Sequence, residues 1–142
     1  MAVISGFSTL NISASVDGAV APETIVENMV EKVDERPFTT EEQVKKYFRD
    51  IPVLVDIAQC ESRFRHTGKS GSIIRGEINP YDIGVMQINE WYHGKTAKKL
   101  GYDLYSIEGN MAYARYLYEK EGSRPWNSSS HCWDDYKELA RK

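Results

Sequence analysis

The chain has 142 residues, a length that fits one domain with its own hydrophobic core. Hydrophobic residues make up 41% of it and charged residues 27%, so the composition excludes a chain that is disordered throughout. The net charge is −3 and no basic face dominates, which argues against nucleic acid as a partner. No apolar run approaches the roughly 20 residues of a membrane span, so we expect no membrane-spanning segment.

The N-terminal part differs from the rest in composition. Residues 1–22 are rich in Ser, Gly, Ala and Asp, which is typical of a tail or a loosely docked arm. The residues that follow repeat apolar side chains at helical spacing and predict one short helix that Pro37 ends. We therefore expect an arm at 1–36 and one domain at 37–142. The first basic residue is Lys32, so a basic leader region is missing, and we interpret the chain as one whose signal peptide has been removed.

Two helices are predicted at the start of the domain. Thr40 followed by Gln43 is a capping-box pattern, so we expect a helix from Thr40 to about Arg49. Pro52 suits the first turn of a second helix. The apolar positions of that second helix continue almost to its C-terminal end, where they are followed by Glu61.

Glycine, asparagine and proline crowd residues 66–84, where a helix is not expected. Short strands of a small sheet are predicted at 72–75 and 81–83. A helix is expected at 96–100, with Gly101 just beyond its C-terminal end.

The strongest helical pattern lies between Ser106 and Gly122, where Met111, Ala114 and Leu117 share one face. A last helix is expected at 133–141. Several short helices around a small glycine-rich insertion with short strands define an α+β fold that is mostly helical.

The chain has two cysteines, Cys60 and Cys132, and no Cys-x-x-Cys pair. Its three histidines are scattered, so we expect no zinc site or other metal centre. The cysteines are either two buried free thiols or one disulfide that closes a long loop. We favour the disulfide, which implies an oxidising, extracytoplasmic compartment.

Glu61 ends an apolar helix and precedes a polar, glycine-rich stretch. A carboxyl group at such a border can be partly desolvated, and desolvation favours its protonated form and keeps a proton available near neutral pH. Protonation of a glycosidic oxygen needs an acid of this kind. Ser62 could hydrogen-bond that carboxyl group or a nearby backbone group. The alternative is a solvated glutamate at a helix end, and position alone favours this alternative.

Residues 82–89 read Asp-Ile-Gly-Val-Met-Gln-Ile-Asn. Gly84 permits close backbone approach, and Met86 offers an adaptable apolar contact. Gln87 and Asn89 carry both donors and acceptors, which suit an N-acetyl amide or a sugar hydroxyl. By itself the segment indicates only a polar binding site, or a polar loop that enters a helix.

Aromatic side chains add a second type of sugar contact. Tyr113, Tyr116 and Tyr118 lie on the strongest helix, and tyrosine combines a face for stacking with a hydroxyl group. At least one of the three is expected to pack in the core. We expect Trp133 in the core as well, while Trp126 suits either the core or a groove.

Together these segments resemble the lytic transglycosylase domain of the soluble (SLT) type, a branch of the lysozyme-like superfamily. The resemblance covers roughly residues 50–135. It rests on Glu61-Ser62 at a helix end, on Gly84-Val85-Met86-Gln87, and on Asn110 with Tyr116-Leu117. The form of residues 82–89 is similar to the branch associated with secretion and conjugation machinery. In having a cysteine directly before the glutamate, the chain is similar to resuscitation-promoting factors, in which the cysteine at this position is disulfide-bonded.

The resemblance implies a lysozyme-like fold and cleavage of the β-1,4 bond between N-acetylmuramic acid and N-acetylglucosamine. Glu61 would protonate the leaving oxygen and then serve as the base for attack by the muramic-acid C6 hydroxyl, which gives a 1,6-anhydro product. No cofactor is implied. The resemblance gives Met86, Gln87 and Tyr116 as substrate contacts, to which the residue chemistry adds Asn89 and Tyr113.

The chain departs from the family pattern in three places. Residues 65–77 are an insertion-like stretch, Tyr113 stands where the family usually has glycine, and Arg124-Pro125-Trp126-Asn127 occupies the region of a late Ala-Tyr-Asn motif. One alternative is therefore a hydrolytic muramidase, in which Asp82 would position a water molecule as the second carboxylate; Glu77 and Glu90 are further candidates. Another is a wall-binding or assembly module without catalysis. We expect a monomer that meets peptidoglycan strands, with or without a secretion or wall-assembly protein as partner.

Overall fold

The structure is a computed structural model that describes residues 36–134. The helix expected before Pro37 and the division of the chain at residue 36 fall on, or depend on, residues outside this range. In chain order the elements are α1 (Thr40–Tyr47), α2 (Pro52–Ser62), β1 (Asp82–Ile83), β2 (Ile88–Asn89), α3 (Glu90–Lys99), α4 (Ile107–Glu121), the 3-10 helix η1 (Arg124–Ser129) and α5 (Ser130–Trp133). Short helices and one small sheet confirm the predicted α+β class with mostly helical content. No helix in the described range is long and apolar enough to cross a membrane.

The capping box of the first helix lies one residue earlier in the chain than the sequence suggested. Thr39 is the N-cap, and it forms a reciprocal capping box with Glu42. The prediction that Thr40 and Gln43 form this box was wrong. Two overlapping Thr-x-x-Glu/Gln patterns compete here, and Glu42 is favoured because Arg36 also binds its carboxylate, which lowers the pKa of Glu42 to about 2.

Helix α2 begins with Pro52 in its first turn, as predicted, because proline lacks the N–H that this position would leave unpaired. It ends at Ser62, and Arg63 follows with a left-handed φ of 53°. The Ser62 hydroxyl donates to the Ala58 carbonyl oxygen at 3.0 Å and accepts the Arg65 N–H at 3.2 Å. Ser62 therefore closes the end of the helix and holds the residue before it, Glu61, in a fixed place.

The sheet is smaller and lies later in the chain than predicted. Strands β1 and β2 pair antiparallel, with Asp82 opposite Asn89 and Ile83 opposite Ile88. Residues 72–75 contribute only isolated bridges through Ile73 and Arg75. Strand β2 was not predicted because its two residues lead directly into α3, which begins at Glu90 rather than near residue 96.

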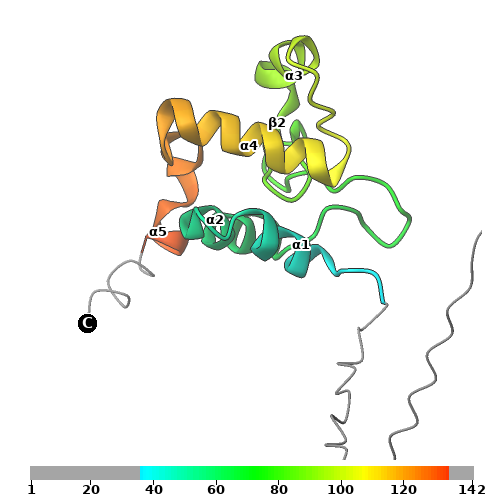
Figure 1. Cartoon of the computed structure of the whole chain (residues 1–142). Helices are drawn as coiled ribbons and strands as arrows, with labels where there is room; N and C mark the ends of the chain where they lie inside the picture. Colours follow the sequence, from blue (N-terminus) through cyan, green and yellow to red (C-terminus); the bar gives the residue numbers. More distant parts are fainter. Residues whose placement is uncertain (1–35, 135–142) are drawn as a thin grey trace, which may run out of the picture. The chain divides into compact units, whose positions relative to one another are not determined.

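Helix α4 matches its prediction from its N-cap Ser106 to Gly122, and it buries Met111, Ala114 and Leu117. In Figure 1 it runs above α2, and the chain then turns through η1 into α5, which packs back on α2. The cysteines are joined by a Cys60–Cys132 disulfide, as predicted. Helix α5 ends at Trp133; the rest of the helix expected at 133–141 lies almost wholly outside the described residues.

A buried asparagine connects α4 to the loop between the two strands. Asn110 is completely buried; its Oδ1 accepts the Met86 N–H at 2.9 Å, and its Nδ2 donates to the carbonyl oxygens of Ile83 and Leu104 at 3.1 and 3.0 Å. Gly84 is required beside it, because φ is +72° and an added Cβ would lie 2.6 Å from Asn110 Nδ2. This contact fixes residues 83–86, the turn that connects Asp82 to Gln87.

Candidate functional site

Glu61 lies in the last turn of α2 and is half-buried. The Ser129 hydroxyl lies 2.5 Å from Glu61 Oε1 and 3.0 Å from the Trp126 carbonyl oxygen, and it accepts the indole N–H of Trp133 at 3.1 Å. These contacts place the carboxyl group between α2 and the η1–α5 segment. The Cys60–Cys132 disulfide joins the same two segments on the neighbouring residue.

The surroundings of Glu61 favour its protonated form. Burial raises its pKa above the ordinary value, the Ser129 hydrogen bond opposes the rise, and the negative charge of Asp82 adds to it. Desolvation is the largest of these effects. The structure therefore supports the expected environment of a partly desolvated acid, which distinguishes Glu61 from a solvated helix-end glutamate.

A pocket of about 100 Å³ opens at this carboxyl group. Its walls come from the end of α2, from the strands and the start of α3, from α4 and from η1. The lining residues are Glu61, Asp82, Gln87, Ile88, Asn89, His93, Leu117, Pro125, Trp126 and Ser128. The structure thus brings together four of the predicted site residues: Glu61, Asp82, Gln87 and Asn89.

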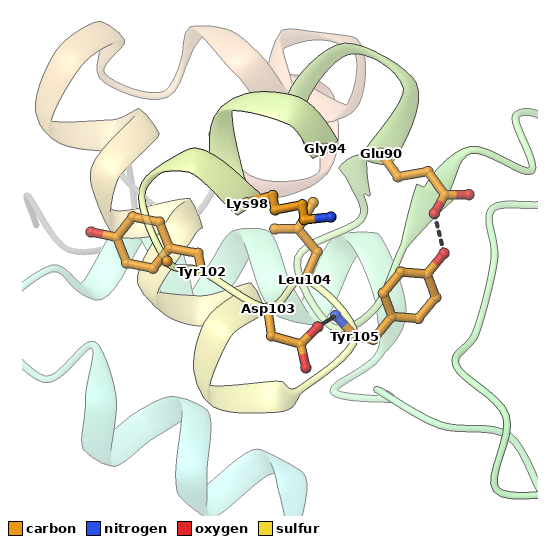
Figure 2. Close-up of a pocket in the computed structure, with 8 residues that line it drawn as sticks. Glu90, Gly94, Lys98, Tyr102, Asp103, Leu104 and Tyr105 are labelled. Atoms are coloured by element: carbon orange, nitrogen blue, oxygen red, sulfur yellow. Dashed lines mark hydrogen bonds between the residues drawn. The ribbon is translucent and has the colours of Figure 1, made fainter.

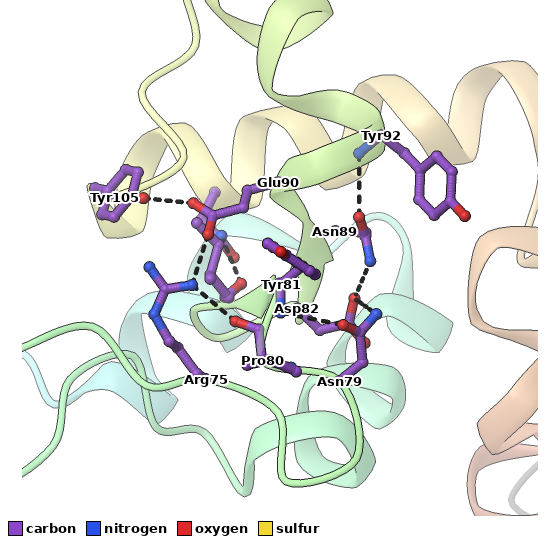
Figure 3. Close-up of polar contacts among 11 residues, drawn as sticks. Arg75, Asn79, Pro80, Tyr81, Asp82, Asn89, Glu90, Tyr92 and Tyr105 are labelled. Atoms are coloured by element: carbon purple, nitrogen blue, oxygen red, sulfur yellow. Dashed lines mark hydrogen bonds and ion pairs between the residues drawn. The ribbon is translucent and has the colours of Figure 1, made fainter.

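Asp82 and Asn89 face each other because they are paired across β1 and β2. Asn89 Nδ2 donates to Asp82 Oδ1 at 2.7 Å, and Asn79 Nδ2 donates to the same oxygen at 3.2 Å. Asn89 Oδ1 meanwhile accepts the Tyr92 N–H and so caps α3. Figure 3 shows this chain of contacts from Asn79 through Asp82 and Asn89 to Tyr92. The Asp82 carboxylate is therefore held in one orientation at the edge of the pocket.

Gln87 lies in a conformation that side-chain-bearing residues seldom adopt. Its φ is 47°, in the left-handed region, and its Nε2 donates to the Gly84 carbonyl oxygen at 2.8 Å. Positive φ at a non-glycine residue is concentrated at functional sites, where surrounding contacts hold the unfavourable backbone. Here the tight 84–87 turn places the Gln87 side chain against the pocket while it buries Met86.

Three predicted substrate contacts lie elsewhere. Met86 is fully buried, and its backbone accepts the Trp126 indole N–H at 2.9 Å, so its side chain belongs to the core and does not reach the pocket. Tyr113 is also buried, and the Tyr116 ring packs against it at a tilt of 32°, with ring centroids 5.4 Å apart. Burial in the core corrects the expected pocket positions of Met86 and Tyr113. Tyr116 is only half-buried and lies outside the pocket lining, so its contact with substrate stays a prediction.

Sequence reasoning missed Ser129 and His93, and left Trp126 open. Trp126 is buried and lines the pocket, while Trp133 lies in the core as expected. His93 lines the pocket, and its Nδ1 is 3.1 Å from the Tyr113 hydroxyl; burial lowers its pKa and so favours the neutral ring. A signal for Ser129 was present, because a disulfide from Cys60 must bring the residues near Cys132 beside Glu61.

Within residues 36–134 no three histidine, cysteine or acidic side chains gather in a way that could hold a metal ion. Comparison of the chain with protein-family models gave no match. Comparisons with curated proteins and with solved structures gave no match either.

Proposed function

We propose that this chain is a peptidoglycan lytic transglycosylase with a lysozyme-like fold, in which Glu61 is the general acid and base. The observation that carries the proposal is the Glu61 environment: a half-buried carboxyl group with a raised pKa at a pocket lined by amide, carboxylate and imidazole groups. The resemblance of the Glu-Ser, Gly-x-Met-Gln and Asn…Tyr-Leu segments to SLT-type domains supplies the reaction. A disulfide fits the extracytoplasmic location of such a substrate.

The contacts of Ser129 suit an acid that must also act as a base. When Glu61 is ionised, the Ser129 O–H donates to Oε1. When Glu61 is protonated, its O–H can donate to Ser129 Oγ, whose own proton then turns to the Trp126 carbonyl oxygen. Both protonation states therefore keep a full set of hydrogen bonds, so Glu61 can give and regain a proton without movement of its neighbours.

In the proposed reaction Glu61 first protonates the glycosidic oxygen that leaves muramic acid. The ionised Glu61 then accepts the proton of the muramic-acid C6 hydroxyl as that oxygen bonds to C1, which closes the 1,6-anhydro ring. One carboxyl group serves both steps because no water molecule has to be activated. Gln87 and Asn89 supply amide groups at the pocket for substrate hydroxyl and N-acetyl groups.

Asp82 gives a specific reason to consider a hydrolytic muramidase as the second candidate. It lines the same pocket as Glu61, and two amide donors fix its Oδ1, which leaves Oδ2 available to orient a water molecule. A non-catalytic wall-binding module is the third candidate. The desolvated acid argues against it, because burial of a carboxyl group costs stability that a binding role does not require.

The deciding experiment digests purified peptidoglycan with the wild type and with Glu61→Gln and identifies the products by mass spectrometry. Glutamine keeps the shape of the side chain but cannot deliver a proton. Glu119→Gln is the matched control, because Glu119 is exposed on α4 and removed from the pocket lining. We expect 1,6-anhydro products from the wild type and from the control, and at least a 100-fold lower rate from Glu61→Gln.

Each other result has one meaning. Reducing-end products would refute the transglycosylase and support a muramidase, in which Asp82→Asn should then remove activity. Equal product from Glu61→Gln and wild type would refute the role of Glu61. Strand binding with no product from any of the proteins would support the wall-binding module.

A further inference from the structure

A second cavity, larger than the Glu61 pocket, lies apart from Glu61 in the described part of the chain. It measures about 510 Å³, within the usual range of ligand sites, and lies between α3 and the loop that leads into α4. Its lining includes Glu90, Gly94, Lys98, Asp103, Leu104 and Tyr105. Because Glu61 does not line this larger cavity, the cavity would hold a part of the ligand other than the bond that is cleaved. Figure 2 shows the side chains that line it.

Helix α3 separates the two cavities. Asn89 and His93 line the Glu61 pocket, whereas Glu90, Gly94 and Lys98 recur at intervals of four residues and line the larger one. A helix with its side chains is about 10–12 Å wide. The two sets of lining residues lie on adjacent faces of this helix, and an extended peptide covers about 3.3–3.6 Å per residue, so a few residues can reach from one face to the next.

Gly94 is an unfavourable choice for the middle of a helix unless open space is needed there. Glycine in a helix interior destabilises the helix relative to alanine. No atom of the described chain lies within 4 Å of a Cβ added at Gly94, so close packing does not require glycine. The absence of a side chain at Gly94 instead keeps the α3 wall of the larger pocket open.

The walls of this pocket are fixed and carry separated charges. Arg75 binds Glu90 at 2.5 Å, and the Tyr105 hydroxyl donates to the other Glu90 oxygen (Figures 2 and 3). Asp103 Oδ1 accepts the Tyr105 N–H at 3.0 Å. The opposite wall is also close-packed, because a Cβ at Gly109 would collide with the Asp103 backbone.

Lys98 is the free cation of this pocket. Its ammonium group has no ion-pair partner among residues 36–134, and Figure 2 shows its end directed toward the side formed by Glu90 and Tyr105. Glu90 is already neutralised by Arg75. Beneath these groups lies Leu104, which is buried. The pocket therefore suits a small ligand with an apolar body, a carboxylate for Lys98 and amide groups for Asp103.

We propose that this cavity binds the short peptide stem carried by muramic acid, with Lys98 on a stem carboxylate. This rests on the proposed function, since only a glycan in the Glu61 pocket would bring a stem to α3. The stem's alanine methyl groups match the apolar floor, and its carboxylates match Lys98. Stem binding makes cleavage selective for glycan strands that still bear peptides.

Binding is tested first by NMR, with the tripeptide L-Ala-γ-D-Glu-L-Lys titrated into the full chain. We expect saturable shifts of the Gly94 and Gly101 amide signals, loss of binding in Gly94→Leu, and about 5-fold weaker binding in Lys98→Met. Leucine fills the cavity and also favours the helix, so unfolding does not explain a loss. Thr96→Leu, at an exposed α3 position outside the pocket lining, is the matched control and should bind like the wild type.

Activity is then compared on intact peptidoglycan and on strands stripped of peptides by an amidase. We expect the wild type to prefer intact strands, and Gly94→Leu to lose this preference while it cleaves stripped strands at the wild-type rate. Absence of tripeptide binding to the wild type, or equal binding by Gly94→Leu, overturns the stem site whether or not the strands are cleaved. Specific tripeptide binding without cleavage of either strand would support the site and refute the proposed enzyme.

Discussion

The disulfide offers the sharpest test of how the fold supports the site. Cys60 and Cys132 are 72 residues apart. Loss of the bond therefore raises the conformational entropy of the unfolded chain by about 15 cal/mol/K, which stabilises the unfolded state by about 4 kcal/mol at 25 °C. We therefore expect the double substitution Cys60→Ala with Cys132→Ala to lower the free energy of unfolding by about 4 kcal/mol. For a urea m-value of about 1.5 kcal/mol/M, the midpoint falls by roughly 2–3 M.

The assay is urea unfolding followed by far-UV circular dichroism, with oxidised and reduced wild type measured beside the variant. If chain entropy is the cause, the reduced wild type should match the variant, and both should show a larger m-value because their unfolded chains are less compact. A loss below about 1 kcal/mol with an unchanged m-value would refute the reasoning. The bond also joins α5 to α2 beside Ser129 and Glu61, so catalytic activity should fall along with stability.

Three further outcomes are expected. Asn110→Leu should lower the free energy of unfolding by at least about 3 kcal/mol in the same assay, because it leaves three backbone groups unpaired in the core; a loss under 1 kcal/mol would contradict this account. Burial raises the pKa of Glu61, so the folded state holds this proton more tightly than the unfolded chain, and wild-type stability falls as pH rises from about 4.5 through the folded-state pKa. Glu61→Gln should therefore be the more stable protein at pH 7 but not at pH 4, and a stability difference independent of pH would show that Glu61 is not desolvated. Ser129→Ala should remove a contact that lowers the Glu61 pKa, and so shift the alkaline limb of the pH–rate profile to higher pH; an unchanged limb would mean that Ser129 does not act on the acid.

Local patterns determined several elements of this protein directly. Pro52 at the start of α2, and Ser106 and Gly122 around α4, follow from backbone preferences of single residues, which act over one or two turns. The mostly helical α+β class follows from the same local signals. The short strands were less predictable, because two-residue strands have too few residues to show an alternating pattern.

Tertiary packing decided which polar residues share the site. Asp82 and Asn89 meet through strand pairing, and Ser129 reaches Glu61 from across the disulfide, 68 residues away along the chain. Packing also decided that Met86 belongs to the core, because the turn that directs Gln87 to the pocket faces the preceding residue inward. The sequence by itself determined the helix that carries Glu61 and pointed to Glu61 as the candidate acid. The groups that surround this carboxyl group depended on long-range contacts that no local pattern encodes.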